Sequence, residues 1–138
     1  ELLGCWRYSV NDTWLHSDAG LMPRRPAAWA SWNYLMDDSS RQRASLTYYL
    51  NRLQRLDEDR EYLVSLNPAT DPAPDTVIRR MSYTHPIFTS ESVVTPSELG
   101  RITGRNRTHF CGAYYGNGFL EDGFASAVSV ADDLGVAF

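Results

Sequence analysis

The residues of this sequence best suited to chemistry lie in a glycine-rich stretch near the C-terminal end, residues 110–134. A short apolar run at residues 109–111, of the kind that ends a buried strand, leads into it. Glycine permits positive φ angles and lets the backbone approach another group closely. The stretch contains Gly112, Gly116, Gly118 and Gly123. It therefore predicts a strand that ends in a tight, glycine-rich crossing.

A helix is predicted after the crossing, because apolar residues recur there at three- and four-residue steps, as on a buried face. They are Phe124, Ala127, Val128, Ala131 and Leu134. A strand, a glycine-rich crossing and a helix N-terminus together form a place where free backbone N–H groups can face an anion. Two interpretations stay open at this point: an anion or cofactor site, or a terminal strand-turn-helix that only closes a core.

The stretch resembles the C-terminal FAD-contacting segment of flavin-containing amine oxidase-like proteins. In that family a strand ending in Phe-x-Gly leads through a turn to a helix with a Gly-Ala-Val-like step. Residues 110–112 (Phe-Cys-Gly) and 126–128 (Ser-Ala-Val) carry the likeness here. The chain is also similar to a bacterial subgroup of predicted NAD/FAD-binding proteins, most specifically at residues 29–34 (Trp-Ala-Ser-Trp-Asn-Tyr). Shorter similar pieces lie at residues 16–18, 21–25, 51–54, 65–68, 85–86 and 118–123.

The resemblance implies that the flavin and the phosphate-bearing part of FAD lie against the start of the last helix. The cofactor-binding residues that it implies are Gly112, Ala113, Tyr114, Tyr115, Glu121, Asp122, Gly123 and Phe124. Many relatives have an acid after Phe-x-Gly that bonds the ribityl hydroxyls of the flavin, but Ala113 stands at that position. Either Glu121 or Asp122 replaces it, or the contact is absent. Asp122 is also expected as the N-cap of the helix. Tyr114 and Tyr115 either line the flavin face or simply pack.

The substrate-side candidates are Trp29, Trp32, Asn33 and His85. Residues 27–36 alternate as a strand that presents aromatic side chains on both faces. These aromatic side chains form either a wall of a substrate pocket beside the flavin or a surface packed under a helix. His85, before Pro86, is the best single candidate for a site imidazole, and its alternative is a structural hydrogen bond.

The family's dinucleotide-binding fingerprint, G-x-G-x-x-G after a first strand, does not occur in this sequence. We therefore expect the C-terminal part of a larger FAD-dependent oxidoreductase whose missing N-terminal half carries the Rossmann fold. The resemblance implies hydride removal from a C–N or C–C bond of an unknown small molecule, and the isolated chain is expected to be inactive. The rival is a non-catalytic α+β binding or partner domain that does not bind FAD alone. Phe119 and the Trp29/Trp32 surface, if uncovered, would allow self-association.

Composition sets the remaining bounds. At 138 residues, with 43% hydrophobic and 22% charged residues, the chain is of ordinary globular composition. A net charge of −4 argues against nucleic acid as a partner, and no apolar run is long enough for a membrane span. Cys5 and Cys111 are expected to be buried free thiols, which together with the family suggests a cytoplasmic protein. The three histidines are too isolated for a metal site.

The predicted fold class is α+β: a mostly antiparallel substrate-domain sheet with few helices, plus a C-terminal strand-turn-helix that completes an FAD-binding domain. We expect residues 1–105 to form the sheet region and residues 106–138 the FAD-contacting part. The predicted elements are a hairpin over 2–14 turning at residues 11–12 and strands at 27–36, 62–66 and 76–83. Residues 45–56 fit helical spacing but begin with strand-prone residues, and there the resemblance implies a strand at 44–49 that runs into a helical turn at 50–56. A capping box beginning at Thr95 predicts a further short helix.

Overall fold

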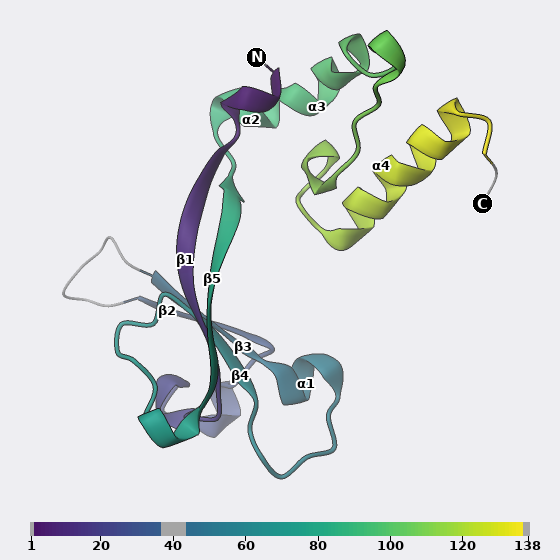
Figure 1. Ribbon diagram of the computed structural model, residues 1–138. Coiled ribbons are helices and arrows are strands. Elements are labelled where there is room, and N and C mark those ends of the chain that lie inside the picture. The colour runs from purple at the N-terminus through teal and green to yellow at the C-terminus, as the bar shows by residue number, and fades with distance from the viewer. Residues whose placement is uncertain (1, 37–43, 137–138) are drawn as a thin grey trace. The chain divides into compact units, whose positions relative to one another are not determined.

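The computed structural model of the chain describes residues 2–36 and 44–136. Within those residues the fold is α+β, with a five-stranded antiparallel sheet and four α-helices (Figure 1). The chain forms two compact units: Ser9–His85, here the sheet unit, and Glu1–Tyr8 with Pro86–Phe138, here the terminal unit. These units do not coincide with the boundary expected at residue 105. The assignment of a substrate side and a cofactor side stays a prediction.

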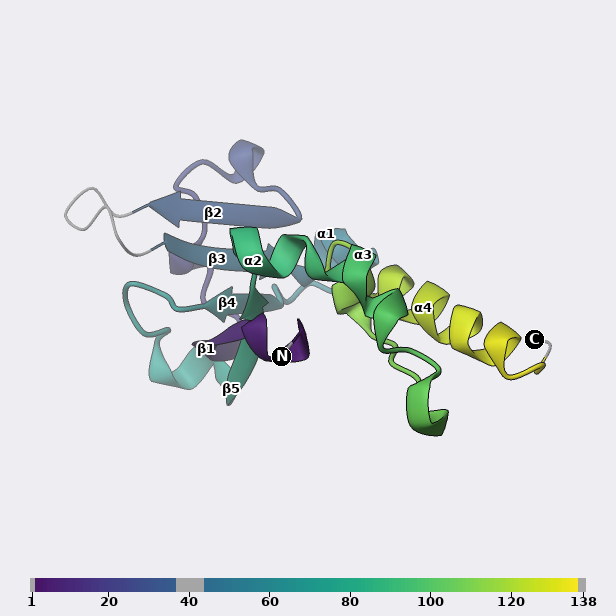
Figure 2. The same cartoon turned by 90° about the horizontal axis from the view of Figure 1, so that it is seen from above.

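The sheet has the strand order β2-β3-β4-β1-β5, which Figure 2 shows from above. The strands are β1 (Arg7–His16), β2 (Trp32–Met36), β3 (Ala44–Tyr49), β4 (Leu63–Leu66) and β5 (Val77–Ile87). The register places Asn33 opposite Thr47, Thr47 opposite Ser65, and Ser65 opposite Trp14. Because directly opposite residues share a face, these four side chains line one face of the sheet, and all four are buried.

The opposite face is apolar and much more open. There the register aligns Trp32 with Tyr48, Tyr48 with Val64, and Val64 with Leu15. Trp32 is 59% exposed, and its neighbour on the same face, Tyr34, is 65% exposed. The covered face thus mixes polar side chains with Trp14 and Leu63, while the aromatic side chains of β2 on the other face are in solvent.

The hairpin predicted for residues 2–14 is wrong, since β1 runs without a turn through Asn11 and Asp12. Both side chains are held by residues distant in sequence. The Asn11 amide oxygen accepts from Asn67 Nδ2 at 2.8 Å, and the Asp12 carboxylate accepts from Arg80 Nε at 2.9 Å. Turn-forming side chains that bond elsewhere in the sheet do not bend the strand, so the local signal failed.

The predicted strand-to-helix change at residues 44–56 is confirmed: β3 ends at Tyr49 and α1 (Leu50–Gln54) follows directly. The strand predicted at 62–66 is confirmed as β4. The strand predicted at 27–36 begins only at Trp32, because residues 26–28 form a 3₁₀ turn with proline at its start. The strand predicted at 76–83 is present as β5, but it runs further than expected, through Pro86 to Ile87. An edge strand tolerates proline since the missing N–H can face solvent.

The terminal unit contains α2 (Ser90–Val93), α3 (Thr95–Glu98) and α4 (Leu120–Asp133). Its core is built on Trp6, whose ring meets Phe88 edge to face at 5.2 Å, and on the fully buried Leu99. Thr95, predicted as an N-cap, is instead the first residue of α3, and its hydroxyl accepts the indole N–H of Trp6 at 3.1 Å. The capping interaction lies one helix earlier, where Thr89 Oγ1 accepts from the N–H of Ser92 at 3.1 Å.

The predicted C-terminal helix is present as α4, but two other expectations for this part are wrong. Residues 109–111 form no strand, and no strand of residues 88–136 lies beside them to complete a ladder. The face of α4 expected to be buried is only partly so: its middle (Ala127, Val128 and Ala131) is half-buried, but Phe124 near its start is 58% exposed and Leu134, the C-cap, is 61% exposed. Helical periodicity correctly indicated the helix and could not show what, if anything, covers it.

The predictions for the two cysteines and for a membrane span can be compared with the structure. Cys5 and Cys111 are free, as predicted, but neither is buried: Cys5 is half-buried and Cys111 is exposed. Among residues 2–36 and 44–136, no helix is both long and apolar enough to cross a membrane.

Candidate functional site

The two halves of the glycine-rich pattern meet in the terminal unit. Ser126 Oγ, on α4, accepts the backbone N–H of Gly112 at 2.8 Å and lies 2.7 Å from the carbonyl oxygen of Gly123, to which it donates. A Cβ atom added at Gly123 would lie 3.4 Å from the backbone nitrogen of Ala113. The crossing therefore packs directly on the first two turns of α4, and the small residues Gly123 and Ser126 form the contact.

The start of α4 differs from the prediction. The helix begins at Leu120 with Phe119 as its N-cap, so Asp122 is the third helical residue and not the cap. Its Oδ2 accepts the backbone N–H groups of Asn117 at 3.0 Å and Phe119 at 2.9 Å. A carboxylate that reaches back to the turn satisfies donors that the helix leaves open. Asp122 is therefore occupied in holding the crossing in place.

Glu121 is the other acid of the first turn, and it is exposed. Among the described contacts, no hydrogen bond or ion pair engages its carboxylate. Two carboxylates in the first turn complement the helix dipole, but they would repel a phosphate placed at the same end. They are suited to groups that donate hydrogen bonds, such as hydroxyls. Of the two acids that the resemblance offers as replacements at Ala113, the structure leaves Glu121 available.

Tyr114 and Tyr115 pack inside the terminal unit. The Tyr114 ring lies 6.3 Å from Trp6 and 5.3 Å from Tyr115, centroid to centroid. Burial raises the pKa of Tyr114, so its phenol stays protonated. The Tyr115 hydroxyl shares a hydrogen bond with Thr103 Oγ1 at 3.1 Å. Tyr114 therefore contacts two aromatic rings of its own unit, and a role for either tyrosine against a flavin stays a prediction.

The four substrate-side candidates all lie in the sheet unit, but they do not converge. Asn33 is buried on the polar face, where its side chain and Ala30 exchange hydrogen bonds of 2.9 and 2.7 Å. Trp29 is half-buried, with its indole N–H donating to the Pro23 carbonyl at 2.8 Å. Trp32 is on the opposite, open face. These three side chains therefore do not line one wall.

His85 is exposed on β5. Its Nδ1 lies 2.8 Å from the Asn11 side-chain nitrogen. The Asn11 amide is oriented by Asn67, which donates to its oxygen, so the nitrogen donates to His85. This contact supports the structural interpretation of His85, because the imidazole is held by a neutral amide and not by an acid that would tune it.

Sequence reasoning missed a buried polar network on the covered face of the sheet. His16 is fully buried, with Nε2 2.9 Å from Ser65 Oγ, and Ser65 Oγ lies 2.7 Å from Thr47 Oγ1. The backbone N–H of Asp18 donates to His16 Nδ1 at 3.0 Å. The sequence showed only that each of these polar residues falls within or beside a predicted strand. It could not show that they meet, because they are far apart in the chain.

The His16–Ser65 pair superficially matches a general base and its nucleophile. In neutral His16, Nδ1 accepts a hydrogen bond, so Nε2 carries the proton and donates to Ser65. A base would need Nε2 free to take the serine proton. Burial lowers the pKa of His16, which keeps the ring neutral, and Ser65 is 0% exposed. The pair is therefore structural, and it fixes the register of three strands.

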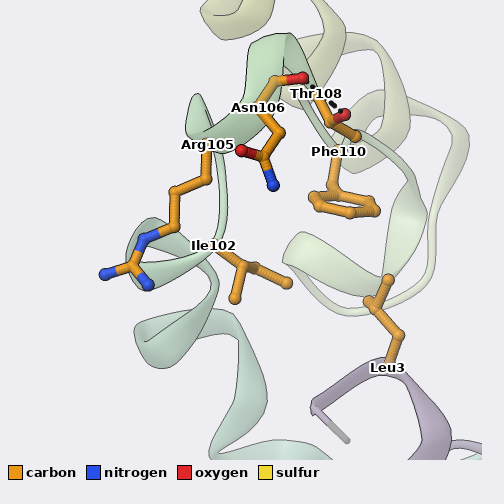
Figure 3. A pocket seen from close by; sticks show the side chains of 6 residues that line it. All are labelled: Leu3, Ile102, Arg105, Asn106, Thr108 and Phe110. Carbon is orange, nitrogen blue, oxygen red and sulfur yellow. Dashed lines mark hydrogen bonds between the residues drawn. The ribbon is translucent and has the colours of Figure 1, made fainter.

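A pocket of 420 Å³ opens in the terminal unit (Figure 3). It is lined by Leu3, Ile102, Arg105, Asn106, Thr108 and Phe110. Figure 3 shows the guanidinium of Arg105 reaching away from the Phe110 ring. The lining is mostly apolar and offers no carboxylate or imidazole. It can accept a small apolar group beside an amide, but it has no side chain suited to acid–base work.

Searches of protein-family models and of curated proteins find no match to this chain. No family is shown. The likeness to flavin-containing amine oxidases thus remains a hypothesis from the sequence.

Proposed function

We propose that this chain is the C-terminal, FAD-contacting part of an FAD-dependent oxidoreductase resembling the flavin-containing amine oxidases. The observation that supports this most is the contact of Gly112 and Ala113 with Gly123 and Ser126 on α4. It brings together the two pieces of sequence on which the resemblance rests. The proposed enzyme removes hydride from an unknown small-molecule substrate, and FAD supplies that redox chemistry when bound.

The residues at the start of α4 would orient the cofactor. Glu121 is proposed to accept hydrogen bonds from cofactor hydroxyls, the role that an acid at the position of Ala113 has in relatives. Asp122 acts indirectly, by holding the turn through Asn117 and Phe119. The residues fit hydroxyl groups better than phosphate, because two negative side chains stand in the first turn. The phosphates of FAD are assigned to the G-x-G-x-x-G segment of the proposed N-terminal half.

The proposed context is a bacterial, cytoplasmic enzyme. Its N-terminal Rossmann half is the principal partner of this chain, and the substrate binds on the side of the sheet unit. The isolated chain is proposed to be inactive, because the main binding site for the FAD pyrophosphate would lie in the N-terminal half.

A second candidate, a non-catalytic α+β binding or partner domain, is favoured by one specific observation. The chain's own side chains occupy the space beside two glycines of the crossing. A Cβ atom at Gly112 would lie 2.4 Å from the Tyr114 ring, and one at Gly116 would lie 2.2 Å from Asp122 Oδ1. These glycines are thus explained by internal packing, with no ligand needed.

The experiment that separates the two candidates begins with the encoding gene. The enzyme predicts an open reading frame continuing upstream through a G-x-G-x-x-G motif, with an acid about 20 residues later. The protein expressed from that frame should bind FAD, detected by flavin fluorescence and the visible spectrum. Removing the acceptor at Glu121 should weaken FAD binding by roughly 10-fold, the effect of losing a charge-assisted hydrogen bond.

The matched control is Glu91→Gln, because Glu91 is likewise an exposed acid in the first turn of a helix. FAD affinity should fall for Glu121→Gln and stay unchanged for Glu91→Gln. A frame with no such motif, together with a chain that does not bind FAD, would favour the binding domain. FAD binding that both variants leave intact would retain the enzyme and remove the role assigned to Glu121.

A further inference from the structure

The two edges of the sheet differ in how they are protected. At one edge, β5 carries Arg79, Arg80 and Pro86, which are typical of natural edge strands that avoid pairing with other chains. At the other edge, β2 consists of Trp-Asn-Tyr-Leu-Met, residues 32–36, with no charge and no proline. Four of its five residues are exposed. An uncharged, apolar and exposed edge strand is the kind that pairs with another strand.

The hydrogen-bonding direction of β2 follows from one contact. The backbone N–H of Tyr49 donates to the carbonyl of Ser31 at 2.9 Å, so residues 31 and 49 form a bonded pair. Bonded and non-bonded pairs alternate along an antiparallel ladder. Asn33 and Leu35 therefore direct their N–H and C=O groups toward β3. Trp32, Tyr34 and Met36 direct theirs outward, away from the sheet.

We infer that β2 pairs with β2 of a second copy of this chain, antiparallel about a twofold axis at Tyr34. This register makes Tyr34 face Tyr34 and Trp32 face Met36 of the second copy, and it uses every outward N–H and C=O group of the strand. It also places a thioether beside an indole, which is a favourable contact. The apolar faces of the two sheets then become continuous.

A second copy is the occupant that the strand itself favours. The pairing is isologous, as the commonest protein dimers are, and a strand without charges meets its own copy without like-charge repulsion. Trp32 and Tyr34 are 59% and 65% exposed, which amounts to about 250 Å² of aromatic surface per copy. The two copies together thus contribute about 500 Å² of aromatic surface. This is below the ~1,200 Å² that the two partners of a stable interface bury in total, so the dimer is weak and depends on concentration. The inference goes beyond the proposed function and does not depend on it.

Sedimentation equilibrium of the unaltered chain from about 10 µM to about 1 mM tests the inference, because a small interface associates in this range. A monomer–dimer equilibrium is expected. Tyr34→Lys should weaken it at least tenfold, since two lysines would face each other at the axis. Tyr83→Lys, on the protected edge, is the matched control and should change the dissociation constant less than twofold. Tyr34 and Tyr83 are both exposed, so both variants should keep the fold, as circular dichroism would check.

Hydrogen exchange of the unaltered chain gives a second test, which does not depend on whether a variant folds. The amides of Trp32, Tyr34 and Met36 should exchange more slowly at high protein concentration, while those of Asn33 and Leu35, already bonded to β3, should not change. A chain that stays monomeric throughout, equal weakening by both lysine variants, or exchange rates at residues 32, 34 and 36 that ignore concentration would each overturn the inference.

Discussion

The sheet unit and the terminal unit differ in the side-chain contacts that hold their interiors together. In the sheet unit a covered face is filled with polar side chains, and His16, Ser65 and Thr47 bond one another there. In the terminal unit the core is built on a single indole, Trp6, which bonds Thr95 and meets the Phe88 ring edge to face. The first unit is specified by a network across three strands, while the second depends on one aromatic anchor and a helix that contributes little to the core.

The difference is clearest at α4. Only Ser126 of this 14-residue helix is buried, whereas Leu120 is 94% and Phe124 58% exposed. A helix gains most of its stability by burying an apolar face. Stability should therefore be concentrated in the sheet unit, and α4 should unfold at a lower free energy than the strands.

The largest expected effect is on Leu63, which is fully buried on β4. Leu63→Ala should reduce the free energy of unfolding by about 3 kcal/mol, since it removes buried methyl groups and leaves a cavity. Leu120→Ala is the matched change on α4 and should alter stability by less than about 0.5 kcal/mol. Urea unfolding followed by circular dichroism measures both. Equal losses would mean that α4 is covered in solution, and the contrast between the units would fail.

A buried serine gives the next largest effect. Ser65→Ala leaves the Nε2–H of His16 and the hydroxyl of Thr47 without their shared partner, which should cost about 2 kcal/mol. The change is small in volume, so the loss reports the network. Thr47→Val tested alone and with Ser65→Ala completes a double-mutant cycle. The two losses should be less than additive, because both remove the same bond; strict additivity would show that the three side chains act independently.

How far the sequence predicted this molecule depends on where each residue finds its partners. The change from strand to helix after Tyr49 was predicted at the right residue, but from the family resemblance, because the apolar residues of this stretch fit helical and strand spacing alike. The turn expected at Asn11 and Asp12 was wrong because their side chains bond partners 56 to 74 residues away. The same reason hid the His16–Ser65 pair, which lies 49 residues apart.

The candidate site shows the same limit. The sequence predicted a glycine-rich crossing followed by a helix, and the contact of Gly112 with Ser126 emerged only in the structure. The sequence could not tell which acid would be engaged, because Asp122 is committed by a turn whose shape depends on Gly116. Apolar periodicity likewise predicted the helix and overestimated its burial, since periodicity describes the helix alone and burial needs a second surface.

Gly116 offers a smaller, local test in the terminal unit. A Cβ atom there would meet Asp122 Oδ1 at 2.2 Å and its Cβ at 2.9 Å, so Gly116→Ala must displace the carboxylate from Asn117 and Phe119. We expect a loss of about 1 kcal/mol, confined to the start of α4. Hydrogen exchange should show faster exchange at residues 117–122 and no change in β3 or β4. Gly100→Ala is the control, because nothing lies within 4 Å of a Cβ atom at Gly100. If both variants behave alike, Asp122 does not hold the turn.

The smallest expected effect is the dependence of stability on pH, and it again separates the units. Burial lowers the pKa of His16 below its ordinary value of 6.5, so the unfolded chain binds a proton at a pH where the folded chain does not. The free energy of unfolding should thus be constant above about pH 7 and decrease as pH falls below about 6.5, until it levels off under the folded pKa of His16.

Measuring unfolding by urea at pH 7.5 and at pH 5.5, about one unit on either side of 6.5, gives the sign directly. His16→Gln should remove most of this decrease, while His85→Asn, which changes an exposed imidazole, should keep it. The carboxylate of Asp18 adds a decrease of the same sign at lower pH. Its pKa is held below 3.8, chiefly by the N–H of Ala73, so this contribution appears only as pH falls toward that range. A decrease that persists in His16→Gln would place the acid sensitivity outside the buried network, and the sheet unit would lose its distinguishing feature.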